Sequence, residues 1–162
     1  MTSTTLYLLC VVIGGVSGLR SLTGIAVVTI VAQRSWPHLG WLHLGGTGLN
    51  FLAMPVAMYV FVLLAIGELI ADKLSFIPPR IQAGPLAVRF LFGAFCGSAL
   101  AVAAGIAWVF PAVIGGVSAV VAGYAGYWLR RSITSRGVKD LPIALLEDAT
   151  AILLALFAVS RF

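Results

Sequence analysis

Five charged side chains lie inside stretches of sequence that are otherwise apolar: one arginine and four acids. They are Arg20, Glu68, Asp72, Glu147 and Asp148. A charge at the centre of a membrane helix costs about 2.5–3.5 kcal/mol on insertion scales, so such residues persist where they pair, line water or bind a ligand. Carboxylates in this setting can hold a proton, Na⁺ or another cation. The five residues are therefore the candidate site for a substrate or a coupling ion.

The four acids form two pairs with different spacing. Glu68 and Asp72 are four residues apart and share one helix face. Glu147 and Asp148 are adjacent, about 100° apart around a helix, so one of them can point elsewhere. At about 1.5 Å per residue, Glu68 and Glu147 both lie on the order of 6–9 Å below the same membrane boundary, and we expect the two pairs to face each other. The alternative is that Asp72 and Asp148 only mark helix ends, where the interface or the helix dipole tolerates an anion.

Arg20 stands in the sequence IGGVSGLRSLTG, among several glycines. Gly14, Gly15 and Gly18 allow helices to pack closely, and they also weaken a helix. We expect the first apolar segment either to continue as one helix or to break near them, and a break would bring Arg20 to the acids as their counter-ion. Whether that pairing is functional or structural stays open. Further residues expected to support the site are Ser21, Thr23 and Lys73.

The whole composition is that of a membrane protein. Hydrophobic residues make up 61% of the chain and charged residues 9%, against roughly 25% charged in a soluble domain. No polar linker divides the 162 residues, so a single polytopic domain is expected. The start of the chain lacks a basic region and a cleavage site, so we expect the first segment to be retained. Cys10 and Cys96 lie in apolar segments and are expected to be inert.

Five membrane-spanning helices are predicted in an all-α fold. Each needs about 20 apolar residues, and the expected ranges are 5–32, 51–74, 86–108, 111–129 and 141–160. Pro78 and Pro79 cannot continue a helix, and Pro111 divides a long uncharged stretch into the third and fourth segments.

Lysines and arginines predict the orientation. Seven follow the second and fourth segments: Lys73, Arg80, Arg89, Arg130, Arg131, Arg136 and Lys139. Only Arg34 and Arg161 lie on the opposite side. Because basic loops stay in the cytoplasm, the prediction is an inner-membrane protein with a cytoplasmic N-terminus and an external C-terminus. The net charge of +5 then reflects loops near anionic lipids, and no nucleic acid is expected as a partner.

The pentapeptide IGGVS occurs twice, at residues 13–17 and 114–118. The copies are three predicted spans apart and would be inverted in the membrane. Segments 1–2 and 4–5 are thus candidates for an inverted repeat, which is a common transporter plan. The alternative is chance, since five small or apolar residues recur easily in such a composition.

Four stretches carry a family resemblance: GLRSLTG, ELIADKLSFIPPR, LAVRFLFGA and LPIALLEDATAI, in this order. With them the chain resembles, over nearly its whole length, the bacterial membrane proteins grouped as domain-of-unknown-function family 4126. It departs from the family's short glycine-proline turn at residues 137–142, which read GVKDLP. The resemblance implies no activity. It implies that the residues of its motifs belong to one site: Arg20, Glu68, Asp72, Lys73, Glu147 and Asp148.

The favoured function is a small secondary transporter or channel, coupled to protons or cations and working as a homodimer in the lipid bilayer on a small ion or molecule. The first alternative is a membrane protein that does not transport but assembles with a partner. The second is a lipid-modifying enzyme, which is disfavoured because no nucleophile or ligand set accompanies the acids. No cofactor is expected, and a metal site at His38 and His43 is not favoured.

Overall fold

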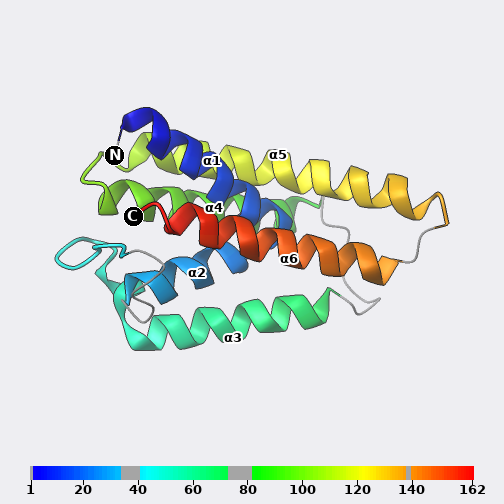
Figure 1. The fold of residues 1–162 in the computed structure, drawn as a ribbon, viewed down its shortest axis with the longest axis horizontal. Helices are drawn as coiled ribbons and strands as arrows, with labels where there is room; N and C mark the ends of the chain where they lie inside the picture. Colours follow the sequence, from blue (N-terminus) through cyan, green and yellow to red (C-terminus); the bar gives the residue numbers. More distant parts are fainter. Residues whose placement is uncertain (1, 34–40, 73–81, 138–139) are drawn as a thin grey trace.

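The computed structural model describes residues 2–33, 41–72, 82–137 and 140–162. All regular structure in these ranges is helical, as predicted. The elements are α1 (Ser3–Leu19), α2 (Thr23–Ala32), the short 3-10 helix η1 (Asn50–Ala53), α3 (Pro55–Ala71), α4 (Ala83–Ala103), α5 (Val109–Thr134) and α6 (Asp140–Val159) (Figure 1). Of the described helices, α4, α5 and α6 are long and apolar enough to cross a membrane.

The last four helices begin and end close to the predicted boundaries. Pro55 opens α3, in keeping with the preference of proline for the first helical turn. Pro111 lies in the first turn of α5, where it is likewise tolerated. The connection between α4 and α5 turns at Gly105, whose φ of 69° is a left-handed conformation that suits glycine. Apolar runs bounded by polar loops, together with Pro111, therefore located these helices.

The first apolar segment is two helices instead of one. Arg20, directly after α1, has extended backbone with φ −136° and ψ 109°. A Cβ atom built on Gly24 would lie 2.7 Å from Ser17 Oγ and 3.6 Å from the Ile13 carbonyl oxygen. A straight helix would hold residues 13 and 24 about 16 Å apart. The chain therefore reverses at residues 20–22, which form the tip of an α1–α2 hairpin.

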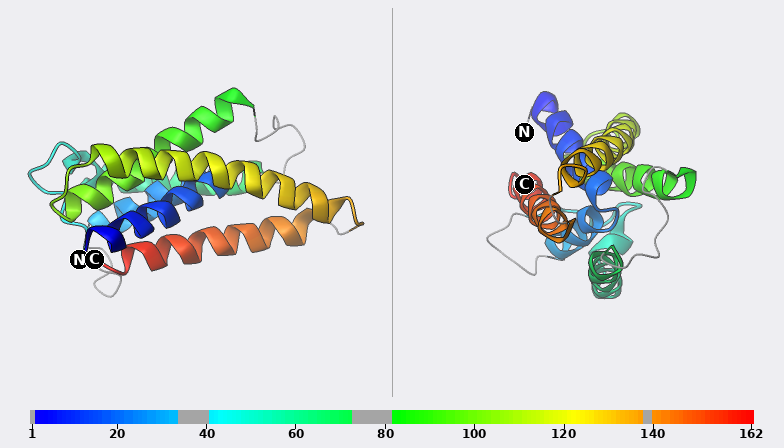
Figure 2. Two further views of the ribbon diagram at one scale, coloured as in Figure 1. Left: turned by 90° about the horizontal axis from the view of Figure 1, so that it is seen from above. Right: turned by 90° about the vertical axis from the view of Figure 1, so that its right-hand side faces the viewer.

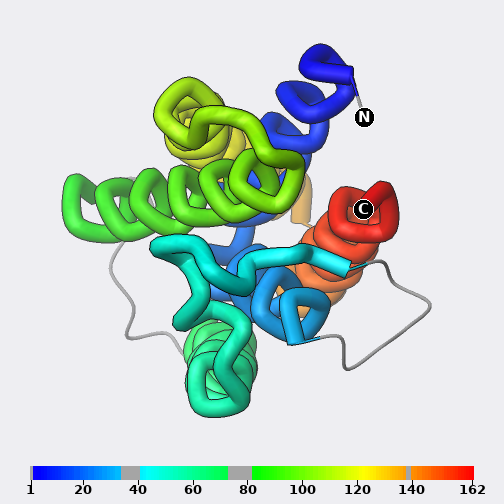
Figure 3. The backbone as a smooth tube through the Cα atoms, turned by 90° about the vertical axis from the view of Figure 1, so that its left-hand side faces the viewer, coloured from blue at the N-terminus to red at the C-terminus, as the bar shows by residue number. Residues whose placement is uncertain are grey.

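The hairpin lies in the middle of the bundle. α1 packs against α4, α5 and α6, and α2 packs against α3, α4 and α6 (Figure 3). Both chain termini lie at one end, whereas the tip points towards the other end, where α5 and α6 extend beyond it (Figures 1 and 2). The predicted five spans and the predicted termini on opposite sides both assumed that segment one crosses once. The structure shows the reversal, and the number of spans and the sides of the two termini stay predictions.

Close glycine contacts hold α1 against its neighbours. A Cβ atom on Gly14 would overlap the backbone of Gly115 in α5, and one on Gly18 would overlap the backbone of Ala119. Gly15 has room, since its nearest neighbour would be the Ala122 methyl group at 3.9 Å. The two IGGVS copies thus cross each other at Gly14 and Gly115. The inverted repeat itself stays a prediction, because α1 has 17 residues and α5 has 26.

The outer surface of the helices is apolar. Leu63 on α3, Val121 on α5 and Leu153 on α6 are each more than half exposed, and many other large hydrophobic side chains share this exposure. A soluble monomer rarely exposes contiguous apolar patches of such extent. A surface of this kind suits contact with lipid tails.

Candidate functional site

Arg20 is the centre of an ion-pair cluster at the hairpin tip. Its side chain is almost fully buried, and its Nη1 lies 2.8 Å from Asp72 Oδ2, at the end of α3. Its Nη2 lies 2.6 Å from Asp148 Oδ1 and 4.0 Å from Glu147 Oε2, both on α6. The extended backbone of Arg20 is what lets one guanidinium reach two helices. The structure thus brings Arg20 together with three of the four acids predicted to be its partners.

Glu68 contacts the hairpin tip through backbone groups. Its two carboxylate oxygens accept hydrogen bonds from the backbone N–H groups of Ser21 and Leu22, each at 2.8 Å. The first N–H groups of a helix have no partner within it, and an anion there is favoured by the helix dipole. Glu68, which lies on α3, therefore caps the start of α2 and stabilises the reversal of the chain.

Arg89 makes the complementary contact and was missed as a site residue. It is buried within α4, and its Nη1 donates to the carbonyl oxygens of Gly18 and Leu19, the latter at 3.5 Å. Those carbonyls end α1, where a cation satisfies unpaired acceptors. From its sequence position, Arg89 was predicted to be a loop cation. Its apolar neighbours on both sides, in LAVRFLFGA, could have indicated that it is buried in a helix.

Arg130 was also taken for a loop cation and lies in the site, near the end of α5. Its Nη1 is 3.0 Å from Asp72 Oδ2 and 3.7 Å from Glu147 Oε2. Its Nε and Nη2 contact both oxygens of Asp140 at 2.7 and 2.5 Å. The three arginines and all five acidic residues of the chain form what we call the tip cluster: Arg20, Glu68, Asp72, Arg89, Arg130, Asp140, Glu147 and Asp148.

The other predicted site residues are placed as follows. Ser21 and Thr23 are buried at the tip, and the Thr23 hydroxyl has no hydrogen-bond partner within the described ranges. Lys73 and His38 lie outside the described residues. His43 is exposed and stacks edge-on against Trp41. Over the part of the chain that the structure describes, no three His, Cys, Asp or Glu side chains are arranged for a metal ion.

Comparison with known proteins supports the resemblance. Residues 8–161 match the family model DUF4126, whose description is a domain of unknown function. The chain belongs to this family. No curated protein and no solved structure matches it. α1 from Leu8 onward and all the later helices named above lie within the matched residues 8–161.

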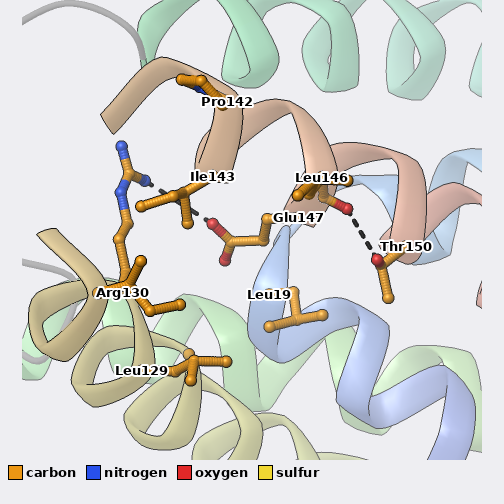
Figure 4. A pocket seen from close by; sticks show the side chains of 10 residues that line it. Leu19, Leu129, Arg130, Pro142, Ile143, Leu146, Glu147 and Thr150 are labelled. Carbon is orange, nitrogen blue, oxygen red and sulfur yellow. Dashed lines mark hydrogen bonds and ion pairs between the residues drawn. The ribbon is translucent and has the colours of Figure 1, made fainter. Parts of the chain in front are cut away.

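A groove beside the tip cluster gives this DUF4126 domain an opening between α5 and α6 (Figure 4). Its volume is about 410 Å³. Leu19 lies at its inner side (Figure 4), Gly126 faces Leu19 and Glu147, and Arg130 and Glu147 are its charged lining residues. The rest of the lining is mainly apolar: Leu129, Ile133, Pro142, Ile143 and Leu146, with Thr150. The groove therefore connects the outer surface of the bundle with two members of the tip cluster.

Proposed function

We propose that the protein is a small secondary transporter or channel, coupled to protons or another cation, and that the tip cluster is its binding site. The observation that carries this proposal is the reversal of the first membrane segment inside a bundle of apolar helices. Interrupted backbone at membrane depth is tolerated where it is buried in protein or lines a cavity. Transporters commonly bind substrate and coupling ions at such interrupted helices.

The charges at the tip fit this role. The ends of α1 and α2 meet there with opposite partial charges, and they are held by Arg89 and Glu68. The side chains of Asp72 and Glu147 keep 15% and 10% exposure, so they are shielded without being fully enclosed. Carboxylates in such surroundings can exchange a guanidinium partner for a proton or a cation. Alternate partners of this kind are what a coupled transporter requires.

The proposed orientation follows from the basic residues and the reversal together. α3 and α5 end, and α4 and α6 begin, towards the end of the bundle to which the tip points (Figure 1). The sequence between α3 and α4 carries Lys73 and Arg80, and the sequence between α5 and α6 carries Arg136 and Lys139. Because basic loops stay in the cytoplasm, the tip faces the cytoplasmic side of the inner membrane. Both termini then lie outside.

Flux measured in proteoliposomes tests the proposal. Purified protein should transport protons or Na⁺ down an imposed gradient, and Glu147→Gln should abolish the flux while its elution and helix content stay unchanged. Asp148→Asn should be milder, because its amide keeps a hydrogen-bond acceptor near Arg20. The matched control is Arg161→Gln, which neutralises a charge at the far end of α6 and should leave the flux intact. If Glu147→Gln gave the same flux as the wild type, the acids would have no role in transport.

One observation favours the non-transporting alternative. The closest contacts of the tip cluster are good ion pairs and helix caps, such as Arg20 to Asp148 at 2.6 Å, which suits a purely structural clamp. Thermal stability in detergent separates a structural clamp from a transporter that binds Na⁺ or K⁺. A transporter that binds a cation should melt at a higher temperature when Na⁺ or K⁺ replaces choline, since a ligand of the native state stabilises it. A structural clamp should show no such difference.

A further inference from the structure

We propose that Arg130 is the gate of the site. It closes the approach to Arg20 from the end of the bundle towards which the hairpin tip points, and its release from Asp140 opens that approach. This inference rests on the proposed function, because it names how access to the same site is controlled. It follows from the order of the ion pairs, from the exposure of their members and from the spacing of residues on α6.

The ion pairs of the tip cluster include a series of alternating charges, which we call the charge ladder. It runs from Asp140 to Arg130, then to Asp72, Arg20 and Asp148. The middle acid is shared, since a single oxygen, Asp72 Oδ2, lies 3.0 Å from Arg130 Nη1 and 2.8 Å from Arg20 Nη1. A cation that follows the acids inward from Asp140 therefore meets Arg130 before it meets Arg20.

Exposure falls along the charge ladder. The side chain of Asp140 is 53% exposed and that of Arg130 is 18% exposed. Those of Asp72 and Arg20 are 15% and 2% exposed. Asp140 is thus the end of the ladder that water reaches, and Arg20 is enclosed. Arg130 and Asp72 lie between the two.

The pair between Arg130 and Asp140 is the one that opens most readily. Water screens an exposed ion pair, so such a pair contributes little to stability, whereas breaking a buried pair leaves an uncompensated charge. Arg130 reaches from α5 to α6 here, since it contacts Asp140 at 2.7 and 2.5 Å and lies 3.7 Å from Glu147 Oε2 (Figure 4). Its release would therefore loosen α5 from α6 and uncover Asp72.

One residue on α6 lies between the outer and the inner end of the charge ladder. Asp140, Ala144 and Asp148 are spaced four residues apart and share one helix face. Ala144 is 1% exposed, although Asp140 is half exposed only one turn away. Access along this face of α6 thus ends just beyond the acid that binds Arg130. A thiol at position 144 would report whether the approach is open.

The experiment measures how fast a positively charged, water-soluble methanethiosulfonate reagent modifies Ala144→Cys in the purified protein. With Arg130 in place the reaction should be slow. Arg130→Ala should raise the rate constant at least about ten-fold, equivalent to about 1.4 kcal/mol in the equilibrium for opening. Asp140→Asn should raise it by a smaller factor, because Arg130 keeps its contact with Asp72.

Arg131→Ala is the matched control, because it makes the same chemical change at the next residue. The Arg131 side chain contacts Tyr127 and Trp128, and its loss should leave the rate at position 144 unchanged. The native cysteines show whether an effect is local. Cys10 and Cys96 are fully buried and should stay unmodified in every variant, as mass spectrometry would show. If they react in Arg130→Ala, that variant has lost its fold, and the comparison of Asp140→Asn with Arg131→Ala decides the question.

Three results would overturn the inference. The first is fast modification of Ala144→Cys with Arg130 in place, because the approach would then already be open. The second is an unchanged rate in both Arg130→Ala and Asp140→Asn, and the third is equal acceleration by Arg131→Ala. If proteoliposomes still show Glu147-dependent flux in any of these cases, the proposed function stands and only the gate fails. If the rates follow the expectation but flux is absent, Arg130 covers the cluster in a protein that does not transport, and the proposed function fails.

Discussion

At the scale of single residues, one arginine joins two helices that are distant in sequence. A guanidinium offers its donors in a fixed planar fork, so its two terminal nitrogens can serve different acceptors. Arg20 uses Nη1 for Asp72 and Nη2 for Asp148. A lysine ammonium is a single point of charge on a flexible chain and cannot hold both contacts in the same way.

Arg20→Ala should strongly destabilise the protein, because it removes the buried cation that pairs with Asp72 and Asp148. Loss of one member of a buried ion pair typically costs about 3–5 kcal/mol, and Arg20→Lys should recover only part of it. In a double-mutant cycle measured by thermal unfolding in detergent, Asp148→Asn should offset some of the Arg20→Ala loss. Arg161→Ala, at the opposite end of α6, should be strictly additive. Additivity with Asp148→Asn as well would show that the pair contributes nothing.

The sequence was informative about some site residues and silent about others. Arg20, Asp72, Glu147 and Asp148 could be selected because charges in apolar stretches are rare and need partners. Arg89 escaped notice because it stands near a loop, where cations are expected on the cytoplasmic side. Arg130 escaped for the same reason. The position of an arginine near a loop does not show whether its side chain faces the cytoplasm or pairs with a buried acid inside the bundle.

At the scale of helices, α1 is held by backbone contact with α5 at positions where a side chain would not fit. Gly14 and Gly115 are in mutual contact, and Gly93 of α4 meets the same point of α5. Membrane helices have no hydrophobic drive towards one another, so packing of small residues supplies much of their association. The glycines before Arg20 therefore serve packing, and the interruption occurs after them.

Gly14→Ala should destabilise the protein by about 1–3 kcal/mol, the usual cost of overpacking, because the new methyl group meets the backbone of Gly115. Gly67→Ala makes the same chemical change where space is open. It should be neutral or stabilising by up to about 1 kcal/mol, through higher helix propensity. Unfolding in a mixed detergent denaturant would measure both. Equal effects at the two positions would contradict the tight crossing.

The break in the first segment could be anticipated only as one of two outcomes. Glycines near Arg20 indicated a weak helix, but they did not fix where it ends. The contacts that fix it come from remote parts of the chain: Glu68 is 47 residues from Ser21, and Arg89 is 71 residues from Gly18. Local propensity cannot report such contacts. The boundaries of α3 to α6, which follow from local apolar runs, polar loops and prolines, were predicted closely.

At the scale of the whole molecule, the α1–α2 hairpin places both termini at one end, although the other helices lie close to the segments predicted from the sequence. Both termini lie at one end of the bundle (Figure 2). Reporters fused before Thr2 and after Phe162 should therefore give the same external signal, and a reporter at Arg136 should give a cytoplasmic one. Opposite signals from the two termini would mean that the first segment crosses the membrane once, as the sequence alone had suggested.

The buried tip also has a consequence for the order in which the chain is made. Arg20 is synthesised early, but Asp72 follows only at the end of α3, and Asp148 lies on the last helix. Until α6 emerges, the growing chain carries a cation at membrane depth with incomplete compensation, which is costly. The α1–α2 hairpin can therefore reach its final, fully ion-paired conformation only after α6 has been synthesised. The pairing of α6 with Arg20 should be a late step in the folding of this protein.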